Sequence, residues 1–183
     1  MTGQPKLRAR NRSQVDSAAT SPVFRRALLV MVIPLLALMT ACSPGISAGP
    51  AIDPVAATSI SGEAIEVPSA DQPTVMVFYS VGCGTCVGIT QHIAGLANQY
   101  PDATYLAVNI DATEDVRTSN TFLDYINSPA ITGINDTDGQ IAKAYNVTSV
   151  STVVVTDSAG GILLDAAYPP LVDVNAAVAQ AAA

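Results

Sequence analysis

The chain has 183 residues, of which 49% are hydrophobic and 13% charged, which is enough apolar surface for one domain of ordinary size with a buried core. Its charge is unevenly divided, because six of the eight basic residues precede residue 42 and all but one of the 15 acidic residues follow it. A body this acidic, without a basic patch, excludes nucleic-acid binding as its function.

The first 41 residues are predicted to be a signal peptide. Residues 1–26 are polar and basic, and residues 27–39 (ALLVMVIPLLALM) are mainly apolar. This apolar run is too short for a membrane-spanning helix, which needs about 20 residues, but it suits the core of a secretory signal. The segment 38–42 (LMTAC) resembles the lipobox of bacterial lipoproteins, in which the cysteine is lipidated and becomes the mature N-terminus. We therefore predict lipidation at Cys42; the alternative is ordinary cleavage nearby, with Cys42 incidental.

Residues 42–57 are rich in Pro, Gly, Ala and Ser, a composition that predicts a flexible tether. A lipid on Cys42 would hold the domain that follows at the extracytoplasmic face of the cell membrane. Disulfides can persist in that compartment.

Residues 58–183 are predicted to form one α/β domain. The segment 58–67 is expected to be a β-hairpin centred on Ser-Gly-Glu. Strands that alternate with helices, followed by a final hairpin, imply a central mixed sheet with helices on both faces. The strands are predicted at 74–79, 104–110, 130–134, 152–156 and 162–166, and the helices at 84–99, 111–126, 138–145 and 171–182.

Cys83 and Cys86 form a C-x-x-C pair between the apolar strand 74–79 and the helix that follows it. Free backbone N–H groups and the helix dipole favour a negative group at such a junction, so a thiol there loses its proton more easily, and only the thiolate attacks disulfides. We predict that Cys83 is the nucleophile and that Cys86, more buried, resolves the mixed disulfide. The alternative is a buried structural disulfide without turnover.

No metal or other cofactor is expected. A structural zinc site needs four ligands, usually Cys and His, and the chain holds three cysteines and the single histidine His92. His92 lies in the predicted helix 84–99 and is expected on its surface.

Four features lie in order along residues 55–183. They are the hairpin 60–65, the strand with its C-x-x-C motif over 75–86, the segment 136–147 (DTDGQIAKAYNV) and the segment 151–162 (STVVVTDSAGGI). Together they resemble the thioredoxin-like superfamily, and most of all its TlpA/ResA branch of membrane-tethered extracytoplasmic thiol–disulfide oxidoreductases. The resemblance implies a thioredoxin-like fold with an N-terminal hairpin extension.

The same resemblance implies a function and partners. It indicates a reductase of protein disulfides, with protein clients that exchange disulfides or dithiols. We expect the protein to be a monomer. A membrane thiol carrier of the CcdA/DsbD type would supply its electrons, and cytochrome c maturation is the process that such a reductase would serve.

The chain departs from the family's pattern at three positions. Gly82 replaces the usual tryptophan before the first cysteine, and Val77 replaces the buried acid of thioredoxins, so proton removal is expected to fall to water or the client. The loop of Val150, Ser151 and Thr152 is expected to face the dithiol, with Ser151 in place of the family's cis-proline. A cis bond before a non-proline residue costs about 2.5–4 kcal/mol. We therefore expect a trans Val150–Ser151 bond, an altered loop and a hydroxyl near the sulfurs.

Two other functions stay open. Two thiolates favour Cu(I) or another soft metal, so a metal-binding module is the first alternative, although no Met or His cluster supports it. The segment Ser80-Val-Gly-Cys83 matches the S/T-x-x-C core of peroxiredoxins, so a thiol peroxidase is the second. Met76 stands where that family has a proline, and Arg117 is the one candidate after residue 42 for its thiolate-binding arginine.

Overall fold

The structure is a computed structural model that describes residues 47–183. The predicted signal peptide, the predicted lipidation site Cys42 and the first residues of the predicted tether lie outside this range. Within it, no helix combines the length and the apolar character needed to cross a membrane.

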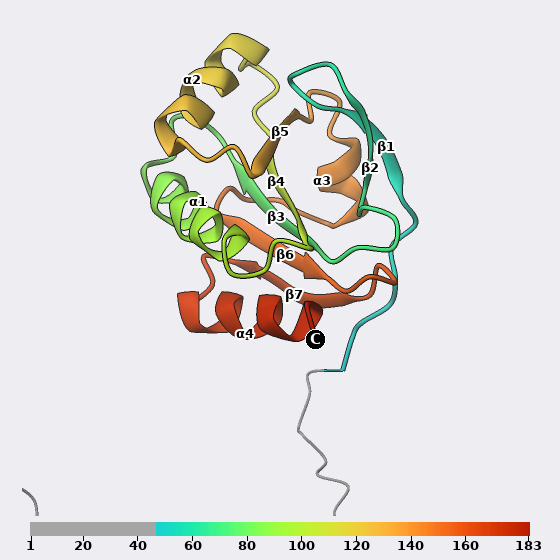
Figure 1. Cartoon of the computed structure of the whole chain (residues 1–183). Coiled ribbons are helices and arrows are strands. Elements are labelled where there is room, and N and C mark those ends of the chain that lie inside the picture. The colour runs from blue at the N-terminus through green and yellow to red at the C-terminus, as the bar shows by residue number, and fades with distance from the viewer. Residues whose placement is uncertain (1–46) are drawn as a thin grey trace, which may run out of the picture. The chain divides into compact units, whose positions relative to one another are not determined.

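A mixed sheet of five strands forms the centre of the domain, in the order β5-β4-β3-β6-β7 (Figure 1). The middle strand β3 (Thr74–Tyr79) runs parallel to β4 (Thr104–Asn109), which runs parallel to β5 (Ile131–Asn135). On its other side β3 pairs antiparallel with β6 (Thr152–Thr156), and β6 pairs antiparallel with the edge strand β7 (Ile162–Ala167).

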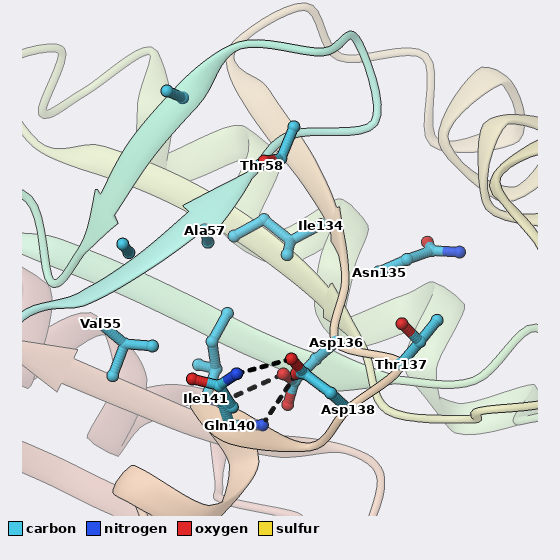
Figure 2. Close-up of a pocket in the computed structure, with 12 residues that line it drawn as sticks. Val55, Ala57, Thr58, Ile134, Asn135, Asp136, Thr137, Asp138, Gln140 and Ile141 are labelled. Atoms are coloured by element: carbon cyan, nitrogen blue, oxygen red, sulfur yellow. Dashed lines mark hydrogen bonds between the residues drawn. The ribbon is translucent and has the colours of Figure 1, made fainter.

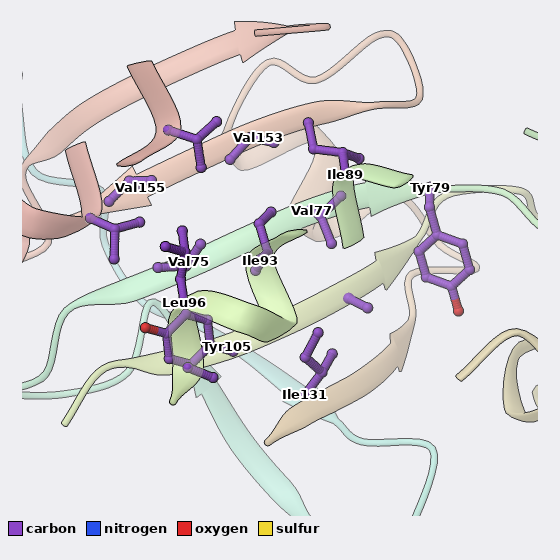
Figure 3. Close-up of a cluster of buried hydrophobic side chains, with 14 of the residues drawn as sticks. Val75, Val77, Tyr79, Ile89, Ile93, Leu96, Tyr105, Ile131, Val153 and Val155 are labelled. Carbon is purple, nitrogen blue, oxygen red and sulfur yellow. The ribbon is translucent and has the colours of Figure 1, made fainter. Parts of the chain in front are cut away.

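Helices cover both faces of this sheet, because the side chains of β3 alternate between two apolar clusters. Val75, Val77 and Tyr79 point into one cluster (Figure 3), and Met76 and Phe78 point into the other. Helices α1 (Gly84–Ala97), α2 (Val116–Ile126) and α4 (Leu171–Ala181) pack into the first cluster, and α3 (Gln140–Ala144) packs into the second. All six residues of β3 are buried, as expected of a strand with helices on both sides. The predicted fold class is confirmed.

The N-terminal hairpin consists of β1 (Val55–Thr58) and β2 (Ala64–Val67), paired antiparallel. It is attached to the edge of β5, where the Ile60 N–H donates to the Gly133 carbonyl at 2.9 Å. Strand β1 begins within the segment predicted to be a tether. Composition signals flexibility there, whereas pairing with β2 and packing of Val55 on the second cluster order the chain.

Two helices begin later than predicted because acidic side chains cap them. Helix α2 starts at Val116 rather than near 111, since the Asp115 carboxylate accepts the Thr118 N–H at 2.8 Å. Helix α3 starts at Gln140 rather than at 138. There Asp138 accepts the N–H of Gln140, and Asp136 accepts the N–H groups of the next two residues.

Asp136 lies on the wall of a pocket that the hairpin and α3 line together (Figure 2). Its side chain is buried, at 5% exposure. One carboxylate oxygen accepts the Ile141 N–H at 3.1 Å and the other accepts the Ala142 N–H at 2.8 Å. These bonds satisfy two donors that the helix itself cannot use, so Asp136 fixes the start of α3.

We expect Asp136→Ala to lower the free energy of unfolding by about 1–3 kcal/mol, because it leaves two N–H groups without an acceptor. Urea denaturation measures this loss. Asp138→Ala is the comparison variant. The exposed Asp138 carboxylate accepts the Gln140 N–H at 3.2 Å and Gln140 Nε2 at 2.7 Å, and water can replace it there, so its loss should be smaller, at most about 1 kcal/mol. Equal losses in the two variants would contradict the capping role of Asp136.

Candidate active site

The C-x-x-C pair lies where β3 ends and α1 begins. Cys83 is the N-cap residue of α1, with extended backbone angles (φ −87°, ψ 103°), and Cys86 lies in the first turn. The two cysteines form a disulfide, with their Cα atoms 5.4 Å apart. Cys86 is fully buried, whereas Cys83 is half-buried. Cys83 is therefore the sulfur that a large partner can reach.

Cys83 lies at the N-terminus of α1, where its carbonyl accepts the Cys86 N–H at 3.1 Å. The Cys83 side chain makes no capping hydrogen bond, and the first turn of α1 holds no acidic residue. Backbone N–H groups and the helix dipole favour a negative charge at this place. In the reduced state, the arrangement favours the Cys83 thiolate, the form that attacks disulfides.

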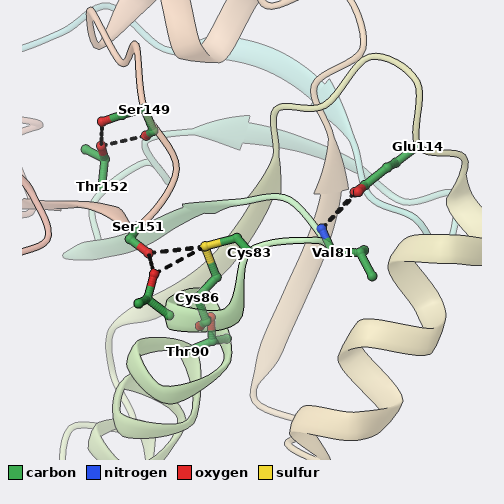
Figure 4. The surroundings of a disulfide bond; sticks show 9 residues. Val81, Cys83, Cys86, Thr90, Glu114, Ser149, Ser151 and Thr152 are labelled. Carbon is green, nitrogen blue, oxygen red and sulfur yellow. Dashed lines mark hydrogen bonds between the residues drawn. A yellow bond between two sulfur atoms is a disulfide. The ribbon is translucent and has the colours of Figure 1, made fainter.

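Two hydroxyl groups contact the sulfurs (Figure 4). The Ser151 Oγ atom lies 3.2 Å from Cys86 Sγ and 3.4 Å from Cys83 Sγ. Thr85 Oγ1 lies 2.9 Å from Ser151 Oγ and 3.4 Å from Cys83 Sγ. Ser151 is buried at 1% exposure, and Thr85 is exposed. The two hydroxyls thus connect the buried side of the dithiol with the surface.

The Val150–Ser151 peptide bond is trans, as expected from the sequence; within residues 47–183 the cis bond is Val67–Pro68. Ser151 has φ +59°, in the left-handed region. Its N–H donates to the Phe78 carbonyl at 2.8 Å, and its carbonyl accepts the Tyr168 N–H at 2.9 Å. A proline could not take this place, because its ring holds φ near −65° and it has no N–H to donate.

Of the three residues of the predicted loop, Ser151 is the one whose side chain is hydrogen-bonded to the dithiol. The Ser151 hydroxyl contacts both sulfurs, and Val150 packs against the apolar cluster that includes Cys86. Thr152 is bound elsewhere, since its hydroxyl donates to the Ser149 carbonyl at 2.8 Å. The second hydroxyl beside the dithiol comes from Thr85 on α1 and not from Thr152. Sequence reasoning missed this residue.

Sequence reasoning also missed Glu114, which holds the loop before Cys83. Both carboxylate oxygens accept the Val81 N–H, at 3.0 and 2.9 Å (Figure 4), and one of them accepts from Asn109 Nδ2 at 2.6 Å. Asn109 also donates to Ser119 Oγ at 2.9 Å. No local motif marks Glu114, because its partner Val81 lies 33 residues earlier in the sequence.

Tyr79 is buried beside the polar network of Glu114, Asn109 and Ser119. Its ring stacks on Phe122 with centroids 4.1 Å apart, and its buried hydroxyl makes no well-aligned hydrogen bond. Burial raises the pKa of Tyr79, and the negative charge of Glu114 raises it further, while Ser119 and Asn109 lower it. The Tyr79 hydroxyl is therefore uncharged at physiological pH, and its side chain packs beside the site without taking up a proton from it.

Neither sulfur has an acidic partner. Val77 is fully buried where thioredoxins have an acid, and within residues 47–183 the side chains hydrogen-bonded to the sulfurs are those of Thr85 and Ser151. In the same range, no group of three or more His, Cys, Asp and Glu side chains could hold a metal ion. Any metal bound at the dithiol would therefore depend on the two thiolates.

The two remaining candidate residues are away from the sulfurs. His92 Nε2 lies 2.6 Å from Asn175 Oδ1, so this half-buried ring links α1 to α4 rather than lying free on the helix surface. The Arg117 side chain is exposed on α2 and makes no hydrogen bond to either sulfur. It is not placed as the thiolate-binding arginine of a peroxiredoxin.

The fold and the C-x-x-C pair at the start of α1 together define a site with two paired cysteines at the end of the central strand. No protein-family model matches the chain. A protein described as mercury resistance operon ORF3 of Streptomyces lividans is 32% identical over 117 residues. The match covers 62% of this chain and 62% of that protein, so the chain spans about six tenths of its relative's length.

Three solved structures share the fold. A secreted Mycobacterium tuberculosis disulfide oxidoreductase homologous to E. coli DsbE is 23% identical, with a TM-score of 0.60 over 68% of this chain and 94% of that one. A putative thiol:disulfide interchange protein DsbE from Chlorobium tepidum is 19% identical, with a TM-score of 0.63 over 75% and 99%. StoA from Bacillus subtilis is 19% identical, with a TM-score of 0.59 over 71% and 99%. These likenesses establish the thioredoxin-like fold.

We expect Glu114→Ala to lower the free energy of unfolding by about 1–3 kcal/mol, because the Val81 N–H and the buried Asn109 amide lose their acceptor. Hydrogen exchange at the Val81 amide should become faster, and NMR measures it directly. Glu114→Gln keeps one acceptor oxygen and should lose less. Unchanged exchange at Val81 in Glu114→Ala would show that the carboxylate does not hold this loop.

Proposed function

We propose that the protein is a thiol–disulfide oxidoreductase that reduces disulfides of extracytoplasmic client proteins. The observation that supports this best is the asymmetry of the dithiol: Cys83 is half-buried at the N-terminus of α1, and Cys86 is fully buried behind it. A structural disulfide needs no accessible sulfur at a helix N-terminus. An exchange enzyme needs one reachable nucleophile and one protected resolving thiol.

The proposed reaction takes two steps from the reduced dithiol. The Cys83 thiolate attacks one sulfur of the client disulfide, which forms a mixed disulfide and releases the other client sulfur as a thiolate. The Cys86 thiolate then attacks Cys83 Sγ, forms the Cys83–Cys86 disulfide and releases the second client thiolate. Two electrons have passed to the client, and a membrane thiol donor of the CcdA/DsbD type would return them.

An apolar groove beside the dithiol suits a protein client. It is lined by Ile89, Ser151, Tyr168 and Leu171 among others. Tyr168 is 58% and Leu171 46% exposed, although large apolar side chains are usually buried. A client whose disulfide is accessible before folding also exposes apolar side chains, and these could pack here while its sulfur reaches Cys83.

The proposal includes a location. The apolar segment 27–39 and the lipobox-like residues before Cys42 support export and lipid anchoring at the extracytoplasmic face of the membrane. Service to cytochrome c maturation is the role that the TlpA/ResA resemblance adds.

A second candidate function is the binding of a soft metal ion as cargo. It is favoured by the relative named for a mercury resistance operon, because thiolates select soft metals. The reduced Cys83 and Cys86 would be the ligands. Stoichiometric uptake of Hg(II) or Cu(I) without disulfide turnover would favour this function over the first.

We expect Cys83→Ser to abolish reduction of insulin disulfides, because it removes the reachable nucleophile, and Cys86→Ser to accumulate mixed disulfides, because it removes the resolving thiol. Insulin turbidity and non-reducing gels measure the two effects. Mixed disulfides trapped by Cys83→Ser instead would reverse the roles. A wild-type protein that binds Hg(II) one-to-one but never turns over insulin would refute the oxidoreductase.

We expect Cys42→Ala to release the protein from the membrane fraction or to leave it as an uncleaved precursor, because the residue that would be lipidated is gone. Metabolic labelling with a fatty acid and cell fractionation measure this. Cys83→Ala is the matched control and should keep the label. Unchanged labelling and fractionation of Cys42→Ala would refute the lipid anchor.

A further inference from the structure

The proposed exchange poses a problem at Cys86, whose thiol must lose a proton before it can attack Cys83. The Cys86 side chain has no exposed surface, and burial in apolar surroundings disfavours a thiolate. Val77 occupies the place of the acid that thioredoxins use, and no acidic side chain within residues 47–183 is hydrogen-bonded to either sulfur. The structure must supply another group beside this sulfur.

We propose that the Ser151 and Thr85 hydroxyls form a proton relay that ionises Cys86 by connecting its buried sulfur to solvent. This inference rests on the proposed dithiol exchange and makes Ser151 a catalytic residue of its second step. The path has two links: 3.2 Å from Cys86 Sγ to Ser151 Oγ, and 2.9 Å from Ser151 Oγ to Thr85 Oγ1. Thr85 is exposed, so the path ends in water.

The chemistry of the hydroxyl groups fits a relay. A hydroxyl both donates and accepts, so each can take a proton from one neighbour and pass its own to the next. Disulfide sulfurs carry no proton and can only accept. In the oxidised state, one of the two hydroxyls can therefore donate to the other, while that second hydroxyl donates to a sulfur.

The backbone holds Ser151 in this place. Its left-handed φ of +59° is kept by the bond from its N–H to the Phe78 carbonyl and by the bond from the Tyr168 N–H to its own carbonyl. Phe78 belongs to the same strand that leads to the dithiol. These two backbone hydrogen bonds therefore hold the Ser151 hydroxyl in a fixed position beside the sulfurs.

The proton balance of the step is as follows. The Cys86 proton passes to Ser151 Oγ, the Ser151 proton to Thr85 Oγ1, and the Thr85 proton to water. The Cys86 thiolate attacks Cys83 Sγ, so the Cys83–Cys86 bond forms and the bond from Cys83 to the client sulfur breaks. The client sulfur leaves with that electron pair and takes a proton from water. The hydroxyls regain their protons and are unchanged.

The test isolates the second step with a chromogenic disulfide, 5,5′-dithiobis(2-nitrobenzoate). The full-length chain carrying Cys42→Ala is reduced and mixed with one equivalent of this reagent in a stopped-flow instrument, between pH 5 and pH 10. The first release of thionitrobenzoate reports attack by Cys83, and the second reports attack by Cys86. The leaving thionitrobenzoate needs no proton, so the pH dependence of the second release reports ionisation of Cys86.

Ser151→Ala should slow the second release by at least about tenfold at pH 7, because loss of a positioned proton-transfer group typically costs that much or more in rate. Thr85→Val should slow it in the same direction, and Thr85→Ser, which keeps a hydroxyl, should match the parent. At pH 10, where hydroxide ionises the thiol without a relay, all variants should converge. Thr121→Val, which removes an exposed helical hydroxyl bonded to the Arg117 carbonyl, is the matched control and should change nothing.

Two results would overturn the relay. The first is a second release in Ser151→Ala and Thr85→Val that equals the parent at every pH. The second is a slowing that is the same at every pH, which would indicate altered packing of the loop. Thr85 is on the surface, so Thr85→Val decides the matter even if Ser151→Ala fails to fold. The assay needs no client, so failure of insulin reduction would refute the proposed function without affecting this result.

Discussion

Burial of β3 between two apolar clusters is the constraint on which the rest of the site depends. Every side chain of Thr74–Tyr79 is inside the protein, and its alternating faces hold α1, α2 and α4 on one side and α3 with the hairpin on the other. The strand cannot slide by one residue without exchanging these faces. The residues that follow it, up to Cys83 and Cys86, therefore emerge at one place beside the start of α1.

The same strand organises the partners of the dithiol. The Phe78 carbonyl, one residue before the end of β3, receives the N–H of Ser151, and the Val81 N–H, just past the strand, is held by Glu114. Ser151, from the later part of the chain, thus contacts the sulfurs. Glu114, from the loop before α2, holds the residues that lead from β3 to Cys83. The site is assembled around the end of one buried strand.

The Ser151 hydroxyl sets the immediate surroundings of both sulfurs. Its buried oxygen lies within 3.4 Å of both sulfurs, at a backbone angle of φ +59° that a proline cannot adopt. This hydroxyl can serve a thiolate in disulfide exchange. It would also lie beside the two sulfurs if the reduced pair bound a soft metal ion. Both proposed functions would therefore use the same two thiolates and the same neighbouring hydroxyl.

The sequence by itself determined the fold class, the order of the elements and the position of the dithiol, because apolar periodicity and the C-x-x-C spacing are local properties. It also predicted the trans bond at Ser151, from the cost of a cis bond before a residue other than proline. Only the tertiary structure decided that β1 begins at Val55, that Glu114 holds Val81, and that Thr85 joins Ser151. The start of β1 depends on its pairing with β2. The other two contacts join residues 33 and 66 positions apart, and the second also depends on the left-handed backbone of Ser151, which the identity of a serine does not reveal.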